Sequence, residues 1–228
     1  MTWQLLRTLP KQQTCSGGIL YWHIRDGTVW HQNRKIRRAD PDTLEVFQMR
    51  GGSGFIARDR HHVYHAWTTL KNTDRASFEH IAANFWRDKN HVYAEHESSL
   101  RPIAQADPDT WQLLDNGYSR DQNRIYHCDR PLPRGTNPDT WQTLGKGYAR
   151  DRNRIYWAGN LLPQSDPDTW QILAANPAFS YDAARVYYYG HPIPQADPAD
   201  WNAERARTAD ITSIMLAIAQ AQTNESAA

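Results

Sequence analysis

The stretch "YARDRNRIYWAGNLLPQSDPDTW" at residues 148–170 contains the features that decide the fold of this 228-residue chain. Its first part alternates apolar and polar residues on either side of the polar turn "DRN", which is typical of a β-hairpin. Aspartate accepts hydrogen bonds from backbone amides two residues further on, and asparagine tolerates the left-handed backbone of a tight turn. A second turn at "AGN" then leads to the segment "DPDTW".

The DPDTW segment is typical of the first turn of a helix. Asp166 is placed to accept hydrogen bonds from free backbone amides, and proline suits the next position because it lacks an N–H group. A second acid favours the helix dipole. Trp170 follows four residues after the cap, where it can point inward. We therefore predict a short helical turn that closes each hairpin.

The same pattern recurs about every thirty residues. A turn aspartate occurs at 26, 59, 88, 121, 151 and 182, and such a period indicates a stacked array or a propeller. Thirty residues are few for a propeller blade, so we favour an open, curved array of β-hairpins in a mainly β fold. The predicted structural anchors are Asp88, Asp121, Asp151, Tyr93, Tyr126, Tyr156, Tyr187, Trp111, Trp141, Trp170 and Trp201.

The repeat pattern predicts one array over residues 1–202, with about six hairpins and a partial unit at residues 2–6. That partial unit, "TWQLL", is identical to residues 110–114, and it either caps the first full repeat or closes a ring. Residues 203–222 place Ile211, Ile214, Met215 and Ile218 at helical spacing. We predict one amphipathic helix that caps the array or binds a partner, followed by a flexible tail at 223–228.

The composition is consistent with a folded protein that carries no strong overall charge. Only 39% of residues are hydrophobic, but 10 Trp, 11 Tyr and 5 Phe supply large rings for a core. A net charge of +1 gives no global field toward nucleic acid or membranes. Cys15 and Cys128 form no CxxC pair and are expected as thiols. The N-terminus lacks a signal pattern and no apolar run is long enough to span a bilayer, so we expect a cytoplasmic protein.

No motif in the sequence indicates catalysis, a metal or a cofactor, and we expect a protein that is not an enzyme. A calcium loop needs six to eight oxygen ligands, whereas each Asp-x-Asn turn offers one carboxylate. The histidines at 61, 62 and 65 lack the spacing and acidic partners of a zinc site.

Positive charge is concentrated in residues 118–156, which contain eight Arg and Lys against four Asp. Two interpretations remain open. The arginines bind an acidic partner, or, as the simpler interpretation that we favour, they pair with the repeated aspartates and keep the array in solution. The candidate partner-binding residues are Arg120, Arg124, Arg150, Arg152 and Arg154, with His61 and His62 from the irregular second repeat.

The segments "FWRDKNHVY" at 85–93 and "ADPDTW" at 106–111 resemble the DKNYY family of bacterial repeat proteins over residues 20–202. The resemblance implies no catalytic residue. It implies a binding or accessory protein, and by analogy an immunity protein that neutralises a toxin. We therefore expect a non-catalytic protein-interaction scaffold whose partner is a cognate toxin. Two alternatives remain, namely glycan binding through Tyr126, Tyr156 and Trp157, and nucleic-acid binding through the arginines, which the charge makes unfavourable.

Overall fold

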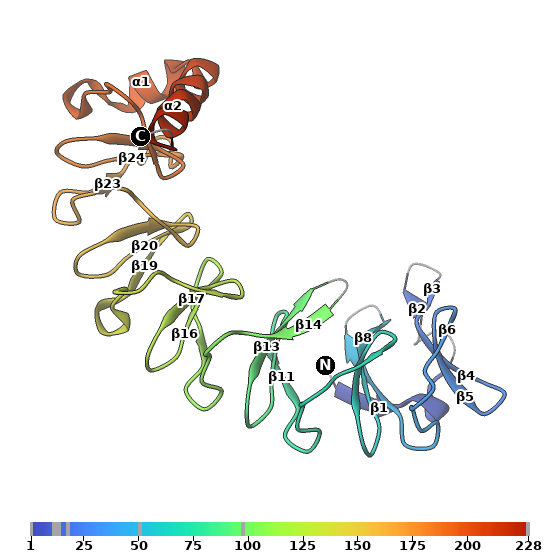
Figure 1. Ribbon diagram of the computed structural model, residues 1–228. Helices are drawn as coiled ribbons and strands as arrows, with labels where there is room; N and C mark the ends of the chain where they lie inside the picture. Colours follow the sequence, from blue (N-terminus) through green and yellow to red (C-terminus); the bar gives the residue numbers. More distant parts are fainter. Residues whose placement is uncertain (1, 11–14, 17–18, 50–51, 97–98, 227–228) are drawn as a thin grey trace. The chain divides into compact units, whose positions relative to one another are not determined.

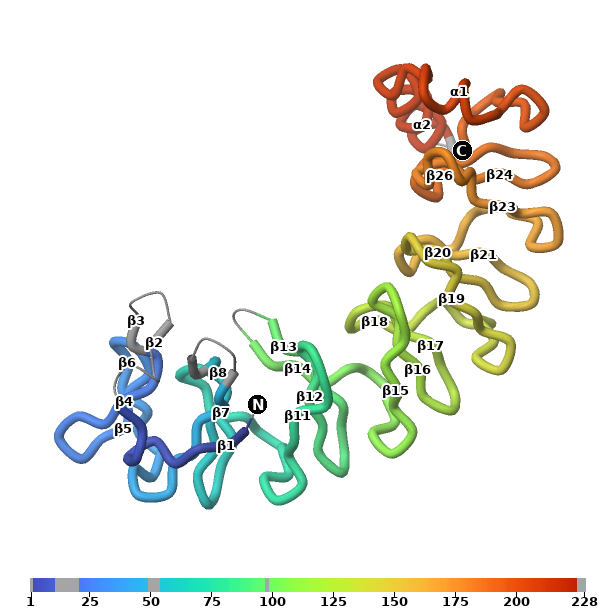
Figure 2. The backbone as a smooth tube through the Cα atoms, turned by 180° about the vertical axis from the view of Figure 1, so that it is seen from behind, coloured from blue at the N-terminus to red at the C-terminus, as the bar shows by residue number. Residues whose placement is uncertain are grey.

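Two compact units of short antiparallel sheets make up the computed structural model, unit 1 over residues 1–109 and unit 2 over residues 110–228. The structure describes residues 2–10, 15–16, 19–49, 52–96 and 99–226. Within each unit the sheets succeed one another along the chain (Figures 1 and 2). Every sheet formed by the described strands has two edge strands, so none of these sheets closes into a barrel. The prediction of a mainly β repeat fold is confirmed.

Unit 2 contains three four-stranded sheets of one topology, in which each strand pairs with the next along the chain. The two central strands of each sheet share one burial pattern, with two buried residues followed by a half-buried one. The strands are β15 (Gln112–Leu113), β16 (Tyr118–Arg120), β17 (Ile125–His127), β18 (Arg130–Pro131), β19 (Gln142–Gly145), β20 (Tyr148–Arg150), β21 (Ile155–Trp157), β22 (Asn160–Leu161), β23 (Gln171–Ile172), β24 (Phe179–Tyr181), β25 (Val186–Tyr188) and β26 (His191–Pro192).

Each central hairpin of unit 2 turns around a buried aspartate. Oδ1 of Asp182 accepts the backbone amides of Ala184 and Arg185, both at 2.8 Å. Its Oδ2 accepts the Tyr187 hydroxyl and the backbone amide of Asp166 from the preceding corner, both at 3.0 Å. These donors satisfy a carboxylate that burial would otherwise disfavour strongly. The turn aspartates Asp59, Asp88, Asp121, Asp151 and Asp182 all accept turn amides and the tyrosine hydroxyl five residues further on.

Trp141 and Trp170 of the corner segments lie between consecutive hairpins. The Trp141 ring centroid is 5.2 Å from that of Tyr118 in the preceding sheet and 5.1 Å from that of Tyr156 in the following one. Trp170 lies 5.0 Å from Tyr148 and belongs to the same core cluster as Tyr187. Each such aromatic pair contributes about 0.5–1.5 kcal/mol beyond its buried area. Trp111 contacts Tyr126, and Trp201 contacts Phe179.

The DPDTW segments form tight corners. Two copies are 3₁₀ helices, η3 (Pro138–Thr140) and η4 (Pro198–Asp200), and the other copies are hydrogen-bonded turns. The residue before the proline caps the corner with its side chain, since Asn137 accepts the backbone amide of Asp139 at 2.9 Å.

Left-handed residues occur in the turns between the outer and central strands of the sheets rather than in the turns of the buried aspartates. Asn123 and Asn153, predicted as left-handed, have no positive φ, whereas Ala158 and Gly159 between β21 and β22 have φ of 46° and 80°. Gly159 also packs on the preceding sheet, where a Cβ at this position would lie 2.7 Å from Cβ of His127. The prediction for the asparagines was therefore wrong, because the Asp side chain accepts the turn amides and the turn needs no left-handed residue.

Unit 1 contains sheets of two to five strands. Its five-stranded sheet takes its edge strand from the N-terminus, since β1 pairs antiparallel with β7 and places Trp3 opposite Phe47. The partial unit at residues 2–6 thus pairs with the second repeat rather than the first. The elements are β1 (Thr2–Leu5), η1 (Leu6–Thr8), β2 (Cys15–Ser16), β3 (Ile19–Leu20), β4 (Trp22–Arg25), β5 (Thr28–His31), β6 (Arg34–Lys35), β7 (Glu45–Met49), β8 (Gly52–Arg58), β9 (Val63–His65), β10 (Thr68–Thr69), β11 (Glu79–Ala82), β12 (Phe85–Arg87), β13 (Val92–His96) and β14 (Ser99–Pro102).

Asp26 differs from the turn aspartates with which the repeat pattern aligned it. Its side chain is 91% exposed. Asp26 and Gly27 have φ of 50° and 67°, so they form a two-residue turn between β4 and β5. Left-handed pairs of this kind are typical of type I′ hairpin turns. The alignment of Asp26 with the buried anchors was therefore wrong.

The C-terminal segment forms two helices instead of the single predicted helix over 203–222. They are α1 (Ala203–Thr208) and α2 (Ile211–Ser226). Asp210 separates them and begins α2, because its Oδ1 accepts the backbone amides of Thr212 and Ser213 at 3.1 and 3.3 Å. Residues 223–226, expected as a flexible tail, continue the helix, and residues 227–228 lie outside the described residues.

The inward face of α2 differs in one residue from the prediction. Ile211 and Ile214 pack against the core cluster that contains Phe179 and Trp201, and Ile218 is buried. Met215, predicted to face the array, is 58% exposed. The helix therefore covers the last sheet with a narrower apolar stripe than the sequence indicated.

We expect Asp182→Asn to lower the free energy of unfolding by about 2–4 kcal/mol, because the new amide group would face the Tyr187 hydroxyl and the Asp166 amide, both donors. Asp26→Asn is the matched control, since asparagine tolerates left-handed turns, and it should change stability by less than about 0.5 kcal/mol. Urea denaturation of both variants checks this. Equal losses at the two positions would contradict the anchoring role of the buried carboxylate.

Candidate functional site

Three positive residues of unit 2, Arg120, Arg150 and Arg152, lie beside the turn aspartates at positions that ion pairs occupy in unit 1. In unit 1, Arg58 precedes a turn aspartate and its Nε lies 2.8 Å from Oε2 of Glu45, its cross-strand partner. Arg87 is paired in the same way with Glu79 at 2.7 Å. These half-buried arginines are therefore neutralised within their own sheets.

Arg120 and Arg150 occupy the same position in unit 2 but face amides. Arg120 is opposite Gln112, and Arg150 is opposite Gln142. Among the described residues, neither arginine forms an ion pair or a side-chain hydrogen bond. Both are half-buried. Each guanidinium therefore keeps a full charge and free donors in a partly desolvated position.

A second set of ion pairs is likewise present in unit 1 and, among the described residues, missing beside Arg152 in unit 2. In unit 1 the residue after the turn aspartate pairs with the first acid of the corner: Arg60 with Asp40 at 3.0 Å, and Lys89 with Asp74 at 2.9 Å. In the sheet that follows η3, the corresponding residue is Arg152, and the corner begins with Asn137 instead of aspartate. Arg152 is exposed, and in the part of the chain that the structure describes it makes no ion pair.

The other two candidate arginines differ from these three. Nη1 of Arg154 donates to the carbonyl oxygen of Arg134 at 2.9 Å, which fixes the preceding loop, and Arg185 donates in the same way to Gln164 at 3.0 Å. Arg124 is exposed at the corresponding position. Arg154 thus has a structural contact that the sequence did not indicate.

The interpretation that the arginines pair with the repeated aspartates was wrong for Asp151 and Asp182. Their carboxylates accept backbone amides and a tyrosine hydroxyl, and their burial leaves 1% of each residue exposed. The physical reason is that a tyrosine hydroxyl and two or three backbone amides already satisfy each buried carboxylate.

The histidines of the second repeat do not form one group. His61 is exposed, and its backbone amide donates to Asp59. His62 is half-buried, with Nδ1 3.8 Å from Oδ1 of the same carboxylate. His65 is 2% exposed and lies 3.8 Å from Oε1 of Glu95 in the next sheet. His61 and His62 lie in unit 1, apart from the candidate arginines of unit 2.

A histidine that the sequence analysis did not select is completely buried in unit 1. His31 lies among rings, with centroid distances of 4.7 Å to Trp22, 5.6 Å to Tyr21 and 5.9 Å to Phe55. Neither ring nitrogen has a hydrogen-bond partner among the described residues. Burial, together with the charges of His65 and His23, lowers the pKa of His31 to about 4.

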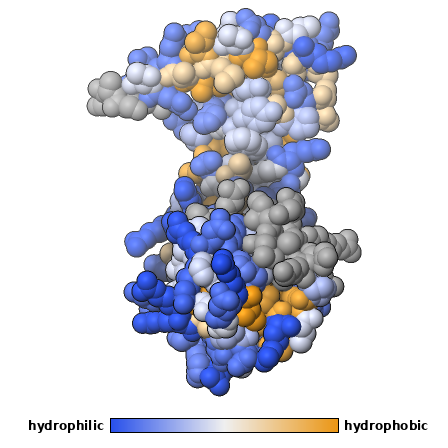
Figure 3. All heavy atoms as spheres, turned by 90° about the vertical axis from the view of Figure 1, so that its right-hand side faces the viewer, coloured by the Kyte–Doolittle hydropathy of each residue, from blue (hydrophilic) through white to orange (hydrophobic). Residues whose placement is uncertain are grey.

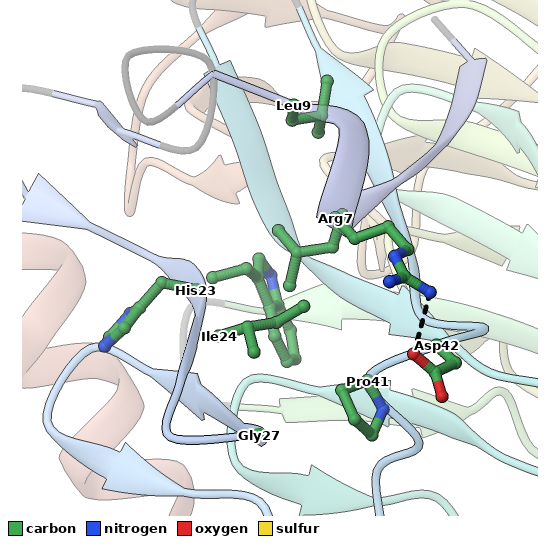
Figure 4. Close-up of a pocket in the computed structure, with 9 residues that line it drawn as sticks. Arg7, Leu9, His23, Ile24, Gly27, Pro41 and Asp42 are labelled. Carbon is green, nitrogen blue, oxygen red and sulfur yellow. Dashed lines mark hydrogen bonds and ion pairs between the residues drawn. The ribbon is translucent and has the colours of Figure 1, made fainter.

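A pocket of about 480 Å³ lies at the start of unit 1, between η1 and the turn of β4 and β5 (Figure 4). Leu9 and Ile24 give it apolar walls, and His23 lies on one side. At its rim, Arg7 and Asp42 pair at 2.8 Å and neutralise each other, while both remain largely exposed. The pocket therefore presents little net charge to a ligand.

An apolar groove of about 460 Å³ lies in unit 2 between the last hairpins and α2. We call it the aromatic groove, and its rings are Trp157, Tyr188 and Tyr189. Tyr189 is 44% exposed, and its ring centroid lies 5.2 Å from that of Trp157. Met215 forms part of the opposite wall. Figure 3 shows hydrophobic residues gathered over the C-terminal helices.

The structure also bears on metal binding, on the two cysteines and on membrane-spanning helices. No group of three or more His, Cys, Asp or Glu within the described ranges could hold a metal ion. Cys128 is a free, exposed thiol, and the side chain of Cys15 lies outside the described residues. Of the helices the structure describes, none has the length and apolar character needed to cross a bilayer.

The fold and these surfaces define a β-hairpin repeat protein. The pattern of the DKNYY family matches residues 21–130 and 131–191, which together form most of the chain. The chain belongs to the DKNYY family. Searches of curated proteins and of solved structures gave no match.

The sequence analysis missed the amides that leave the arginines unpaired. One signal was readable, because "NPDTWQ" at 137–142 replaces the aspartate of "DPDTWQ" at 107–112 and 166–171. The importance of Gln112 and Gln142 depends on strand register, which the sequence alone did not fix. Tyr189 was missed because the sequence places it in a turn but does not show that its ring lies 5.2 Å from that of Trp157 in the preceding sheet.

We expect unit 1 to lose stability in acid because of His31. Its pKa is about 4 in the folded chain and about 6.5 in the unfolded chain, so only the unfolded state gains a proton in between. The contribution of His31 to the free energy of unfolding is constant above pH 6.5, and it falls by about 3 kcal/mol as the pH drops to 4. His31→Phe should remove that part of the pH dependence, as measured by denaturation at each pH. The exposed His61→Asn is the control, and an unchanged slope in His31→Phe would contradict the assignment.

Proposed function

We propose that the chain is a non-catalytic protein-binding scaffold, and that its partner is a bacterial toxin that it neutralises. The supporting observation is a division between repeated and variable positions. The turn aspartates and the tyrosines five residues after them recur, and every one of them is buried. The positions directly after the turn aspartates are all exposed and differ from sheet to sheet: Arg60, Lys89, Gln122, Arg152 and Ala183.

This division is what a binding scaffold requires. Residues that recur hold each sheet in place, so exposed residues can change without loss of the fold. Antiparallel sheets anchored in this way are preorganised, which reduces the entropy lost on binding. The variable row in unit 2 also contains uncompensated positive charge, which favours a partner with a complementary surface.

The toxin as partner is an analogy with repeat proteins that act beside bacterial toxins, and it supplies a direct experiment. We expect the tagged chain to co-purify with the product of an adjacent toxin gene when the two are co-expressed. Cells that express the toxin product should regain growth when the chain is present. Absence of both a complex and growth rescue would contradict this function.

Glycan binding is a second candidate, favoured by the aromatic groove. Tyr126 and Tyr156, the rings first considered for sugar stacking, are fully buried and cannot contact a glycan. Trp157 and Tyr189 present ring surface at the groove, and sugars stack on such rings. Among the described residues that line the groove there is no Asp, Glu, Lys or Arg, so a neutral glycan would fit it better than an anionic one.

For this candidate we expect Tyr189→Ala to abolish the binding of any neutral glycan that the wild-type chain retains on a glycan array. Trp67→Ala changes an exposed turn aromatic of unit 1 and serves as the control, with binding unchanged. Binding that survives Tyr189→Ala, or its loss in both variants, would exclude the aromatic groove as the glycan site.

A further inference from the structure

We propose that Arg120, Arg150 and Arg152 form a docking site for the carboxylates of an acidic protein segment. The site is the basic surface of unit 2, and it rests on the proposed protein-binding function. Each arginine occupies a position where unit 1 has an internal ion pair. Arg120 and Arg150 lie opposite glutamines in strand register, and the corner that precedes Arg152 begins with Asn137 instead of aspartate. The site therefore arises because amides in unit 2 replace the acids of unit 1, while the backbone around them is arranged in the same way.

The frame around these positions is the same in both units. The backbone amide of Arg152 donates to Oγ1 of Thr140 at 3.1 Å, and that of Arg60 donates to Oγ1 of Thr43 at 3.2 Å. Asn137 donates its backbone amide to Asp151 as Asp40 does to Asp59, at 2.9 and 3.0 Å. An aspartate at 137 would thus stand beside Arg152 as Asp40 stands beside Arg60.

The strand register shows that Arg120 and Arg150 also lie opposite an amide where unit 1 has an acid. Glu45 and Glu79 lie directly opposite Arg58 and Arg87 and accept hydrogen bonds from their Nε atoms. Gln112 and Gln142 hold the corresponding register in unit 2. A glutamine side chain has the length of glutamate but no charge, so the guanidinium donors remain available to an incoming carboxylate.

The chemistry of these donors favours carboxylates from a protein. A guanidinium binds a carboxylate through two parallel hydrogen bonds, and partial burial strengthens such charge-assisted pairs. Nucleic-acid binding depends on a broad positive field along a phosphate chain. Unit 2 has 11 Arg and Lys against 13 Asp and Glu, a net charge of −2, so it lacks that field. Three discrete cations on two adjacent sheets fit an acidic protein segment better.

The test restores the missing acids and removes no arginine. The variant Gln112→Glu/Asn137→Asp/Gln142→Glu should form the three internal pairs seen in unit 1 and keep the melting temperature of the wild-type chain. Its matched control, Asn160→Asp/Gln171→Glu/Gln220→Glu, adds the same charge at exposed amides that have no arginine opposite. In register, Asn160 faces Trp157 and Gln171 faces Tyr181.

The probe is a fluorescently labelled polyglutamate peptide, measured by anisotropy with the full chain at low salt. We expect binding by the wild-type chain, a loss of about ten-fold in affinity in the restored variant and a change below about two-fold in the control. Equal losses in the two variants, or no binding by the wild-type chain, would overturn the site. Tighter binding of a labelled single-stranded oligonucleotide than of the peptide would overturn the choice of a protein partner.

The same variants separate this inference from the proposed function. An adjacent toxin product that binds the wild-type chain and the restored variant equally well would overturn the docking site and leave the scaffold function intact. Peptide binding that follows the expected pattern, without any complex with a toxin product, would support the site and contradict the toxin as partner.

Discussion

The fold of this chain depends on one buried carboxylate in each of five repeats, namely Asp59, Asp88, Asp121, Asp151 and Asp182. A buried carboxylate is stable only when fixed donors surround it, and here each donor comes from a different part of the repeat. Turn amides define the hairpin, a tyrosine hydroxyl fixes the second central strand, and the first amide of the corner ties in the preceding connection, as Asp182 shows. Burial opposes ionisation of Asp59, but the hydrogen bonds of Tyr64 and of three backbone amides outweigh it and lower the pKa of that carboxyl. One residue thereby positions a turn, a strand and a corner together.

The same anchor determines which side chains are left for other roles. Once an aspartate and a tyrosine fix the turn, the next residue is exposed in every described repeat, whether it is Arg60, Lys89 or Ala183. Surface ion pairs at such positions contribute only about 0–1 kcal/mol to stability. The fold can therefore lose the acid of a pair, as at Asn137, without losing the corner, because the amide oxygen of asparagine still caps Asp139.

The repeat, the hairpins and the tryptophan junctions could be predicted from sequence because each has a local chemical cause. The role of Asp151 as a turn residue followed from its sequence, but its burial did not, and the exposure of Asp26 did not follow from the repeat period. The glycine directly after Asp26 was the local signal that distinguishes it from the buried aspartates, because Asp-Gly is typical of a two-residue hairpin turn. The break before α2 was also readable, because Asp210 with Ser213 is a helix cap. The pairing of Arg58 with Glu45 could not be predicted from sequence. The two residues are thirteen positions apart, and only the register between their strands places them opposite each other.

The two units use the same backbone frame but distribute charge differently, and this difference bears on function. In unit 1 the half-buried Arg58 and Arg87 are paired with glutamates of their own sheets, so these two positions offer little to a charged partner. In unit 2 the amides Gln112 and Gln142 keep the shape of the strand edge while leaving the guanidinium groups unpaired. A partly buried cation without a counter-ion loses hydration and gains nothing within the free protein, so it adds no stability there. A partner carboxylate supplies the missing interaction only on binding, and the gain that exceeds its desolvation cost then appears as affinity and specificity.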